Sequence, residues 1–308
     1  MSDRSDLRDR LVAAHTTIDL DGDVHLWDFG GSGPLIVLVH GLGGSRSNWV
    51  SVVDDFLPLG RVIVPDLIGF GSTRLDGRSS AVNHQVAMIA DLIEHFDQGP
   101  AILVGNSMGG LISLLVASRH PDVVDRFVLV DAALPTTEPR ITPATAMRLG
   151  LPLLPGIGPR LFERLAKGKS PQRSVDDLMK LLMADPKRLR SEDRELLIEF
   201  AAERRTMAWM TRAFADASRS IARILVSPQR FERSVQRVGA PGLIIQGTSD
   251  LIVRPSSARW LAKRRPDWPL VMLEGVGHVP QLEVPEQFSE VVLGWLDQTT
   301  PDAGAPRH

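Results

Sequence analysis

The segment "LVGNSMGG" at residues 103–110 places one serine between closely spaced glycines, after an apolar run and before a helix-like run. Residues 105–109 match the pattern G-x-S-x-G, in which a strand turns sharply into a helix. Such a turn strains the central residue and brings backbone segments close together, so its neighbours must be small. The pattern predicts an exposed Ser107 hydroxyl above a helix N-terminus, which favours negative charge. The plainer interpretation is that Ser107 only caps the helix.

Short apolar runs recur on both sides of this turn and indicate a parallel sheet. Continuous apolarity is typical of strands that are covered on both faces. Stretches with helical spacing lie between the runs, so we expect an α/β fold with a mostly parallel central sheet flanked by helices. The predicted strands cover residues 34–40, 61–66, 101–106, 126–131, 241–247 and 269–275, and the predicted helices cover 84–96, 108–120, 255–265 and 285–298.

The alternation of strands and helices stops in one long segment. Residues 135–236 have helical periodicity and many arginines but no strand-like run, which predicts a helical cap over the site. Residues 1–134 and 237–300 are then the two parts of one core, and 301–308 is a disordered tail. The Leu-rich, basic stretch 145–168 is interpreted as a cap helix, with peripheral contact to lipid as the less favoured alternative.

The composition excludes several classes of protein. The 308 residues include 35 basic and 37 acidic side chains, and the net charge of −2 gives no footprint for nucleic acid. The N-terminus is charged and lacks the apolar core of a secretory signal. No apolar run approaches the ~20 residues of a membrane-spanning helix. We therefore expect a cytoplasmic protein without a transmembrane segment, whose oligomeric state stays open.

No motif for a cofactor or a metal is present. The chain has no cysteine, so thiolate ligands and a cysteine nucleophile are excluded. The glycine-rich stretches 30–33 and 41–44 match neither a dinucleotide fingerprint nor a phosphate-binding loop. No cluster of histidine and carboxylate has the spacing of metal ligands. We expect neither cofactor nor metal.

Partners for Ser107 follow from the chemistry of a hydroxyl nucleophile, which needs a base that a carboxylate orients. His278 lies on a loop after the last apolar run, and Asp250 closes the run before it. The chain order Ser107, Asp250, His278 is the order expected for this turn. Asp131 also ends an apolar run and is the rival acid. Asp250 is preferred because "GTSD" places it on a short loop directly after the strand.

Acyl transfer also needs backbone N–H groups that meet the developing oxyanion. The residue after the nucleophile, Met108, supplies one donor. The loop "VHGLGGSRSNW" at 39–49 follows an early strand, and Leu42 is the predicted second donor. His40 is interpreted as a ring that braces this loop rather than as a second base.

Together these residues resemble the α/β-hydrolase fold family. The resemblance covers roughly residues 25–135 and 237–297. It implies a cofactor-free serine hydrolase with Ser107 as nucleophile. A serine at this position speaks against the haloalkane dehalogenases and epoxide hydrolases of this fold, which carry an aspartate there. The segments that carry it are "HG" at 40–41, "GNSMGG" at 105–110, Asp250 and "GH" at 277–278.

Within the family, the serine motif and the pair Asn48-Trp49 look like the hydrolases that cleave carbon–carbon bonds in meta-ring-fission products. That resemblance implies that Asn48 and Asn106 contact a substrate acid or ketone. Two features depart from it: Val279 stands where those enzymes usually have tryptophan, and no single cap arginine stands out. The segment "DLIGFGST" is closer to esterase-like members. Hydrolysis of a carboxylic ester is therefore the first prediction, and C–C hydrolysis is the alternative.

Further substrate contacts are predicted on the serine side and in the cap. Gly41 and Val279 adjoin the predicted donor loop and base, and "RTMAWMTRAF" at 205–214 offers Trp209 in an apolar stretch. Such a stretch is more often core, but as a lining it suits acyl or aromatic small molecules better than sugars. A ligand sensor with slow turnover on the same fold is the other class considered.

Overall fold

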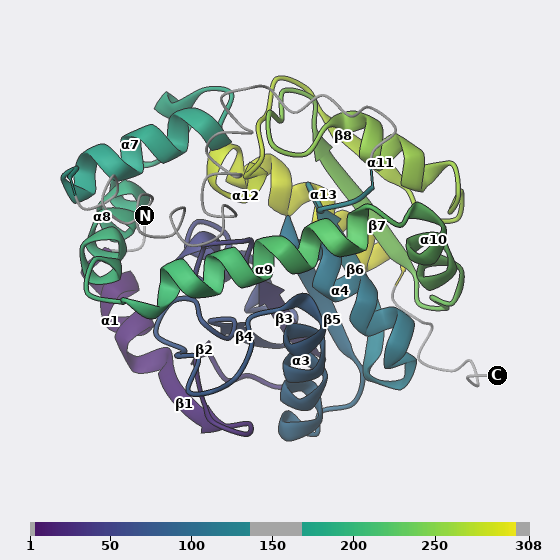
Figure 1. Ribbon diagram of the computed structural model, residues 1–308, viewed down its shortest axis with the longest axis horizontal. Coiled ribbons are helices and arrows are strands. Elements are labelled where there is room, and N and C mark those ends of the chain that lie inside the picture. The colour runs from purple at the N-terminus through teal and green to yellow at the C-terminus, as the bar shows by residue number, and fades with distance from the viewer. Residues whose placement is uncertain (1–3, 136–167, 300–308) are drawn as a thin grey trace.

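The computed structural model describes residues 4–135 and 168–299, with side chains from residue 7 onward. An eight-stranded sheet in the order β1-β2-β4-β3-β5-β6-β7-β8 runs through the molecule (Figure 1). Strands β3 to β8 are parallel, which confirms the six predicted strands. The strands are β1 (His15–Asp19), β2 (Asp23–Asp28), β3 (Leu35–Val39), β4 (Arg61–Pro65), β5 (Ala101–Asn106), β6 (Val124–Val130), β7 (Gly242–Gly247) and β8 (Leu270–Leu273).

The antiparallel hairpin β1–β2 at one edge was not predicted from the sequence. Its first strand, "HTTID", is polar and alternates between exposed and half-buried residues, so it carries no continuous apolar run. Pairing with β4 supplies the stability that such a strand lacks on its own.

Four helices, α3, α4, α11 and α13, confirm the four predicted helices, and their ends differ from the predicted ends by at most three residues. The first helix was not predicted because its sequence is charged on all sides. The α-helices are α1 (Arg4–Ala14), α2 (Val53–Phe56), α3 (Val82–Phe96), α4 (Met108–Arg119), α7 (Pro171–Leu182), α8 (Ser191–Arg204), α9 (Trp209–Leu225), α10 (Pro228–Gln236), α11 (Pro255–Ala262), α12 (Pro280–Glu283) and α13 (Pro285–Gln298). Short 3₁₀ turns are η1 (Arg46–Trp49), η2 (Pro121–Val123) and η4 (Pro186–Arg188).

Each face of the sheet has its own apolar core. Leu35, Val37 and Val39 of β3 pack on the face covered by α3 and α4, whereas Ile36 and Leu38 pack on the face of α2 and α13. All five residues are fully buried. Burial on both faces explains why β3 is apolar at every position.

Helices α7 to α10 lie between β6 and β7 in the chain, and the described part of this insertion contains no strand. Figure 1 shows the long helix α9 crossing in front of the sheet, with α3 below it in this view. The contact with α3 includes a hydrogen bond from the Val82 N–H to Ser220 Oγ, with an N···O distance of 3.0 Å. Residues 136–167 lie outside the described residues, and they include nearly all of the stretch 145–168 that was considered for lipid contact. The predicted tail 301–308 also lies outside the described residues. Within the described part of the chain, no helix is long and apolar enough to cross a membrane.

The strand order creates one favourable place for a ligand. Strand β3 lies between β4 and β5, so the chain leaves β3 toward one side and later leaves β5 toward the other. Ligands of open parallel sheets bind where connections diverge in this way, at the carboxyl ends of the strands. The loop after β3, residues 40–44, and Ser107 after β5 lie at this point.

Candidate active site

Ser107 occupies a strained turn between β5 and α4. Its backbone angles are φ 56° and ψ −114°, in a region that residues with a Cβ rarely adopt. Its N–H donates to Val130 O (2.9 Å), and its carbonyl accepts from the Ala133 N–H (2.9 Å). Although Ser107 stands at the N-cap position of α4, its side chain makes no capping hydrogen bond. The capping interpretation is therefore wrong, and the Ser107 hydroxyl makes no hydrogen bond to another described residue.

The small residues of the turn are required by close backbone contacts. A Cβ on Gly105 would lie 2.4 Å from the backbone of Gly109, and a Cβ on Gly109 would lie 2.1 Å from Val39 O. Gly41 lies on the other side of the serine, where an added Cβ would be 3.1 Å from Ser107 Cβ. The glycines of the motif therefore reflect steric necessity at this crossing of strand, helix and loop.

His278 and Asp250 form a buried pair at the same edge of the sheet. His278 Nδ1 lies 2.7 Å from Asp250 Oδ2, and the two side chains are 6% and 0% exposed. Asp250 Oδ1 accepts from the N–H groups of Ile252 (2.7 Å) and Val253 (3.0 Å). With Nδ1 engaged, Nε2 is the ring nitrogen that remains for a hydroxyl. Within the described residues no hydrogen bond joins Nε2 to Ser107, and such contacts often tighten only when substrate binds.

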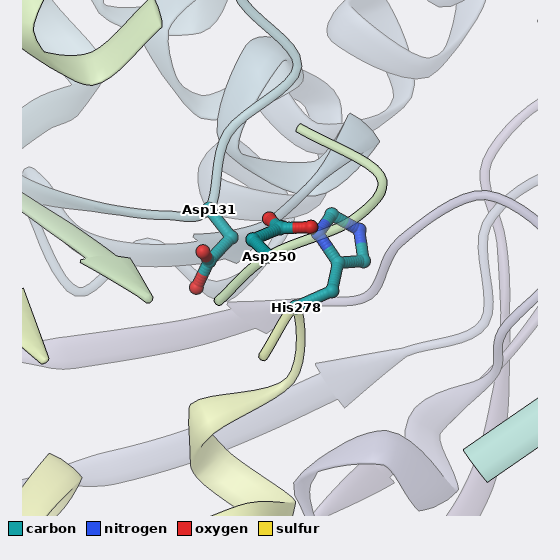
Figure 2. A group of neighbouring side chains, drawn as sticks. All are labelled: Asp131, Asp250 and His278. Atoms are coloured by element: carbon teal, nitrogen blue, oxygen red, sulfur yellow. The ribbon is translucent and has the colours of Figure 1, made fainter. Parts of the chain in front are cut away.

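Asp131 lies beside this pair but not on the imidazole. Figure 2 shows the Asp250 carboxyl group between Asp131 and the ring of His278. Asp131 Oδ1 accepts from Gln246 Nε2 (2.6 Å) and from the Gly247 N–H (2.9 Å). Burial, followed by the neighbouring Asp250 carboxylate, raises the pKa of Asp131 well above its usual value. Between the two acids that the sequence offered, the geometry places Asp250 on the histidine.

The same three side chains are the one group of described acidic and histidine residues close enough to share a metal ion. Asp250 Oδ2 already accepts a hydrogen bond from His278 Nδ1, and Asp131 Oδ1 accepts hydrogen bonds from Gln246 and Gly247. These donors fit a hydrogen-bonded network better than a ligand set.

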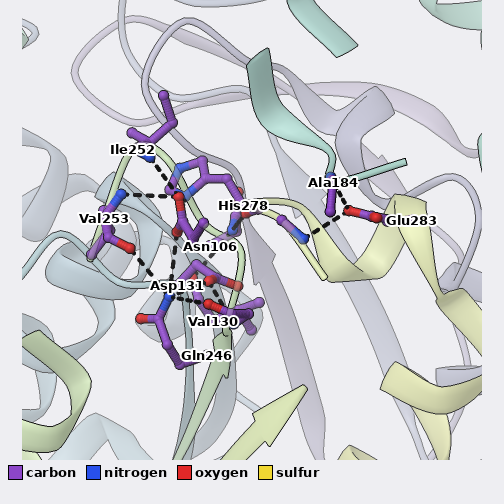
Figure 3. A network of polar contacts seen from close by, with 12 residues as sticks. Asn106, Val130, Asp131, Ala184, Gln246, Ile252, Val253, His278 and Glu283 are labelled. Atoms are coloured by element: carbon purple, nitrogen blue, oxygen red, sulfur yellow. Dashed lines mark hydrogen bonds and ion pairs between the residues drawn. The ribbon is translucent and has the colours of Figure 1, made fainter. Parts of the chain in front are cut away.

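The loop of His278 is held by its backbone as well. The His278 N–H donates to Leu182 O of the insertion (2.6 Å), and Asn106 Nδ2 donates to His278 O (3.0 Å) and Val130 O (3.2 Å). Figure 3 shows this network. Asn106 is 2% exposed because it still lies within β5. Its amide therefore positions the histidine loop, which differs from the substrate contact that the resemblance implied.

Glu283 ties the insertion to that loop and was missed by sequence reasoning. Its Oε2 accepts from the N–H groups of Gly277 (2.8 Å) and Ala184 (3.0 Å), and Oε1 accepts from Asp185 (2.9 Å). Arg188 lies 3.4 Å from Oε1. The carboxylate is fully buried and satisfied by backbone donors from two distant segments (Figure 3). Only an acidic residue in an otherwise apolar stretch hinted at it.

We expect Glu283→Gln to destabilise the protein by about 1–3 kcal/mol, since the amide turns one N–H group toward backbone donors. Urea unfolding measures this change. Glu290→Gln, at an exposed position of α13, is the matched control and should leave the free energy of unfolding within about 0.5 kcal/mol. Equal stability of the two variants would contradict the prediction.

His40 braces the loop after β3, as predicted. Its buried ring contacts Gly41 O through Nδ1 (2.7 Å), while Nε2 accepts from the Leu67 N–H (3.0 Å). Because Nε2 is an acceptor, Nδ1 carries the proton and donates to Gly41. Within the described residues neither the Leu42 N–H nor the Met108 N–H has a hydrogen-bond partner. Both predicted oxyanion donors are therefore available.

Burial lowers the pKa of His40 from its usual 6.5, and this gives stability a pH dependence. Below pH 6.5 the His40 ring is protonated in the unfolded chain but stays neutral in the folded protein. The free energy of unfolding therefore decreases as the pH is lowered below 6.5. The contribution is at most about 1.4 kcal/mol per pH unit. Urea unfolding between pH 8 and 5.5 should show a smaller slope for His40→Gln than for wild type. Equal slopes would show that His40 does not contribute.

A cavity of about 270 Å³ lies between the loop after β3 and helices α7, α8 and the start of α9. The same loop borders both the cavity, through Gly43 and Gly44, and the serine, through Gly41. Ser107 and His278 are not among the described lining residues. Those residues are mostly apolar: Gly43, Gly44, Ser47, Asn48, Ser174, Val175, Leu178, Met179, Leu182, Leu197, Phe200, Ala201, Arg204, Arg205, Met207, Ala208, Met210 and Thr211.

Three predicted substrate contacts have different places in this arrangement. Asn48 lines the cavity, although its Oδ1 also accepts from the Ser45 N–H (2.8 Å). Trp209 does not reach the cavity: its ring lies under the Arg74 guanidinium and lines a separate polar cleft. Successive helical residues point about 100° apart, so Met210 faces inward where Trp209 does not. Val279 is 1% exposed and packs in the core.

Arg204 is one of two described arginines that line this cavity, and the sequence did not single it out. Its Nη1 donates to Gly43 O (3.0 Å), and no described carboxylate pairs with it. Burial lowers the pKa of its guanidinium. Arg204 is half-buried, and a partly desolvated cation on an apolar cavity favours an anionic ligand group.

The fold, the strained serine and the buried acid–histidine pair are the features by which the class of this protein is recognised. A family model for the α/β-hydrolase fold matches residues 34–285, and the chain belongs to this family. It is 29% identical to a 2-hydroxymuconate semialdehyde hydrolase of Pseudomonas sp. (strain CF600), over 91% of this chain and 92% of that protein. It is 27% identical to Lipase 1 of Psychrobacter immobilis, over 84% and 75% of the two chains. The crystal structure of a putative lipase from Acinetobacter baumannii superposes with a TM-score of 0.74 at 23% identity, covering 97% and 96% of the chains.

Proposed function

We propose that the protein is a cofactor-free serine hydrolase that forms an acyl-enzyme on Ser107 and acts on a small to medium apolar carboxylic ester. The observation that carries the proposal is the strained, uncapped Ser107 at the same sheet edge as the His278–Asp250 pair. Strain of this kind persists only where surrounding contacts enforce it, and it is concentrated at functional sites.

The proposed mechanism assigns one role to each group. His278 Nε2 takes the Ser107 proton as Oγ attacks the substrate carbonyl. The Leu42 and Met108 N–H groups stabilise the oxyanion, and the N-terminus of α4 adds a favourable dipole. The leaving alcohol takes the proton from His278. Water that His278 deprotonates then releases the acid, while Asp250 orients the imidazole and stabilises its cation.

Arg204 favours a second candidate, hydrolysis of a C–C bond in a diketone acid. Such a substrate carries a carboxylate, and Arg204 is a shielded cation without a described acidic partner. The 2-hydroxymuconate semialdehyde hydrolase relative supports this chemistry, and the lipase relative supports ester hydrolysis. The same nucleophile, base and oxyanion donors serve both reactions.

Substrate profiling tests the choice. Purified protein would be assayed with p-nitrophenyl esters of increasing acyl length and with a meta-ring-fission product whose absorbance falls on cleavage. Turnover of esters with acid release supports the first candidate. Cleavage of the diketone acid with at least about tenfold higher kcat/KM supports the second. Inactivity with both, together with ligand binding, would favour the sensor alternative.

We expect Arg204→Leu to separate charged from neutral substrates. Loss of a charge-assisted hydrogen bond lowers kcat/KM for an acid substrate by about 10- to 150-fold. Neutral p-nitrophenyl esters should change less than about threefold. Arg212→Leu, at an exposed position of α9, is the control and should affect neither substrate. An equal loss for both substrate types would contradict the anion-binding role of Arg204.

A further inference from the structure

Asp131 is a buried carboxyl group for which the proposed mechanism has no use. It follows β6 with φ 44°, a conformation rare for a residue with a side chain, and it is 0% exposed. Oδ1 accepts two hydrogen bonds, from Gln246 Nε2 and the Gly247 N–H. Oδ2 is buried and receives no hydrogen bond from a described donor, and a side-chain contact with the Asp250 carboxyl group is among the causes that raise the pKa of Asp131. An unsatisfied buried oxygen is unfavourable, so its retention beside the base calls for a reason.

The surroundings of Asp131 join it to the acid of the base pair. Gln246 Nε2 lies 2.6 Å from Asp131 Oδ1 and 3.4 Å from Asp250 Oδ2, so one amide bridges the two carboxyl groups. One carboxylate oxygen of each aspartate and one ring nitrogen of His278 all lie within 4.8 Å of one another. An oxygen of the Asp131 carboxyl group therefore lies within 4.8 Å of an imidazole nitrogen.

Two carboxyl groups this close cannot both be ionised at low cost. The raised pKa of Asp131 has burial as its first cause and the Asp250 charge as its second. The proton of Asp131 belongs on Oδ2, because Oδ1 already accepts two N–H groups. If the Asp250 carboxylate is removed, its charge and its side-chain contact, two of the causes that raise the pKa of Asp131, disappear, while burial and the Glu283 charge remain.

We propose that Asp131 is a reserve acid for His278: a positioning residue that turns its carboxylate to the imidazole when Asp250 cannot supply one. This proposal rests on the proposed function, since it assumes that His278 is the working base. In the unmodified protein Asp131 contributes through the shared Gln246 bridge, which holds Asp250 in place. Loss of the acid from a serine–histidine–aspartate triad otherwise lowers kcat by about 10⁴-fold.

The test is a double-mutant cycle on the full chain. Asp250→Ser removes the carboxylate, leaves space beside His278, and keeps an oxygen that can accept from the Ile252 and Val253 N–H groups. The readouts are the rate at which a fluorophosphonate probe modifies Ser107, located by peptide mapping, and kcat/KM with the best p-nitrophenyl ester. Urea unfolding of each variant checks that it is folded.

We expect kcat/KM and the labelling rate of Asp250→Ser to fall by no more than about 100-fold relative to wild type. Both should fall by about 10⁴-fold when Asp250→Ser is combined with Asp131→Asn. Asp131→Asn alone should lose less than about tenfold. The kcat/KM of Asp250→Asn should be lower than that of Asp250→Ser, because the asparagine amide still fills the position beside His278 Nδ1 and blocks Asp131. A mere space-filling role for Asp131 predicts the opposite order.

The pH profile gives a readout that structural damage would not move. A carboxylate beside an imidazole favours its protonated form, so loss of both aspartates should shift the acid limb of kcat/KM to lower pH. In Asp250→Ser the limb should stay near that of wild type. The proposal is overturned if Asp250→Ser alone loses about 10⁴-fold and removal of Asp131 adds nothing. Failure of the proposed function would look different, because wild type itself would not be labelled on Ser107.

Discussion

Ser107→Ala should abolish turnover while the protein remains folded. The alanine lacks the oxygen that attacks the carbonyl, and removal of a triad nucleophile lowers kcat by about 10⁶-fold. The side chain makes no capping hydrogen bond to α4, so its loss removes no stabilising contact of that kind. Ester hydrolysis and urea unfolding of wild type and variant measure the two effects.

Two further measurements make the test of Ser107 specific. A fluorophosphonate probe should label wild type at Ser107 alone and should not label the alanine variant. Ser107→Gly should be as inactive as Ser107→Ala. Its free energy of unfolding should be about 1–2 kcal/mol higher than that of Ser107→Ala, because glycine adopts φ 56° without strain. Residual turnover of the alanine variant within tenfold of wild type would refute the nucleophile assignment.

Gly109→Ala should prevent stable folding. A Cβ at this position would lie 2.1 Å from Val39 O and 2.8 Å from His40 O, both in the backbone of the adjacent strand and loop. Neither atom belongs to a flexible side chain, so β3 and α4 must separate. We expect a loss of at least about 3 kcal/mol in the free energy of unfolding. Yield of folded protein, circular dichroism and urea unfolding report the result.

Gly294→Ala is the matched control for that substitution. Gly294 lies in the interior of α13, and a Cβ there would meet no heavy atom within 4 Å. Alanine has a higher helix propensity, so this variant should be stabilised by up to about 1 kcal/mol. If Gly109→Ala were as stable as Gly294→Ala, the close packing of the turn against β3 would be wrong.

The parallel strands were predictable because each is buried on both faces. In β5 every residue from Ala101 to Asn106 is buried, and this leaves a continuous apolar run in the sequence. The edge hairpin β1–β2 leaves no such run, since one face of β1 is exposed. Its place is decided by pairing with β4, a contact between residues far apart in the chain.

The proposed catalytic residues were predictable for a local reason: each lies within five residues of the end of a parallel strand. The residues that hold them were not. Gln246 is a polar residue inside an apolar strand, and Glu283 belongs to a four-residue helix. Arg204 is one of many arginines in the insertion. Each of them has a partner far away in the chain that no local pattern indicates: Asp131 for Gln246, the backbone of 184–185 for Glu283, and Gly43 for Arg204.

Local sequence was sufficient for the turn at Ser107, since its sterics act between near neighbours such as Gly105 and Gly109. It was also sufficient for the six parallel strands and for placing Ser107, Asp250 and His278 after the ends of three of them. Tertiary structure alone decided which acid meets His278, that Asn106 positions a loop, and that Trp209 faces away from the cavity. These outcomes depend on how the ends of separate strands and the inserted helices approach one another. Such long-range geometry leaves no periodic pattern in the chain.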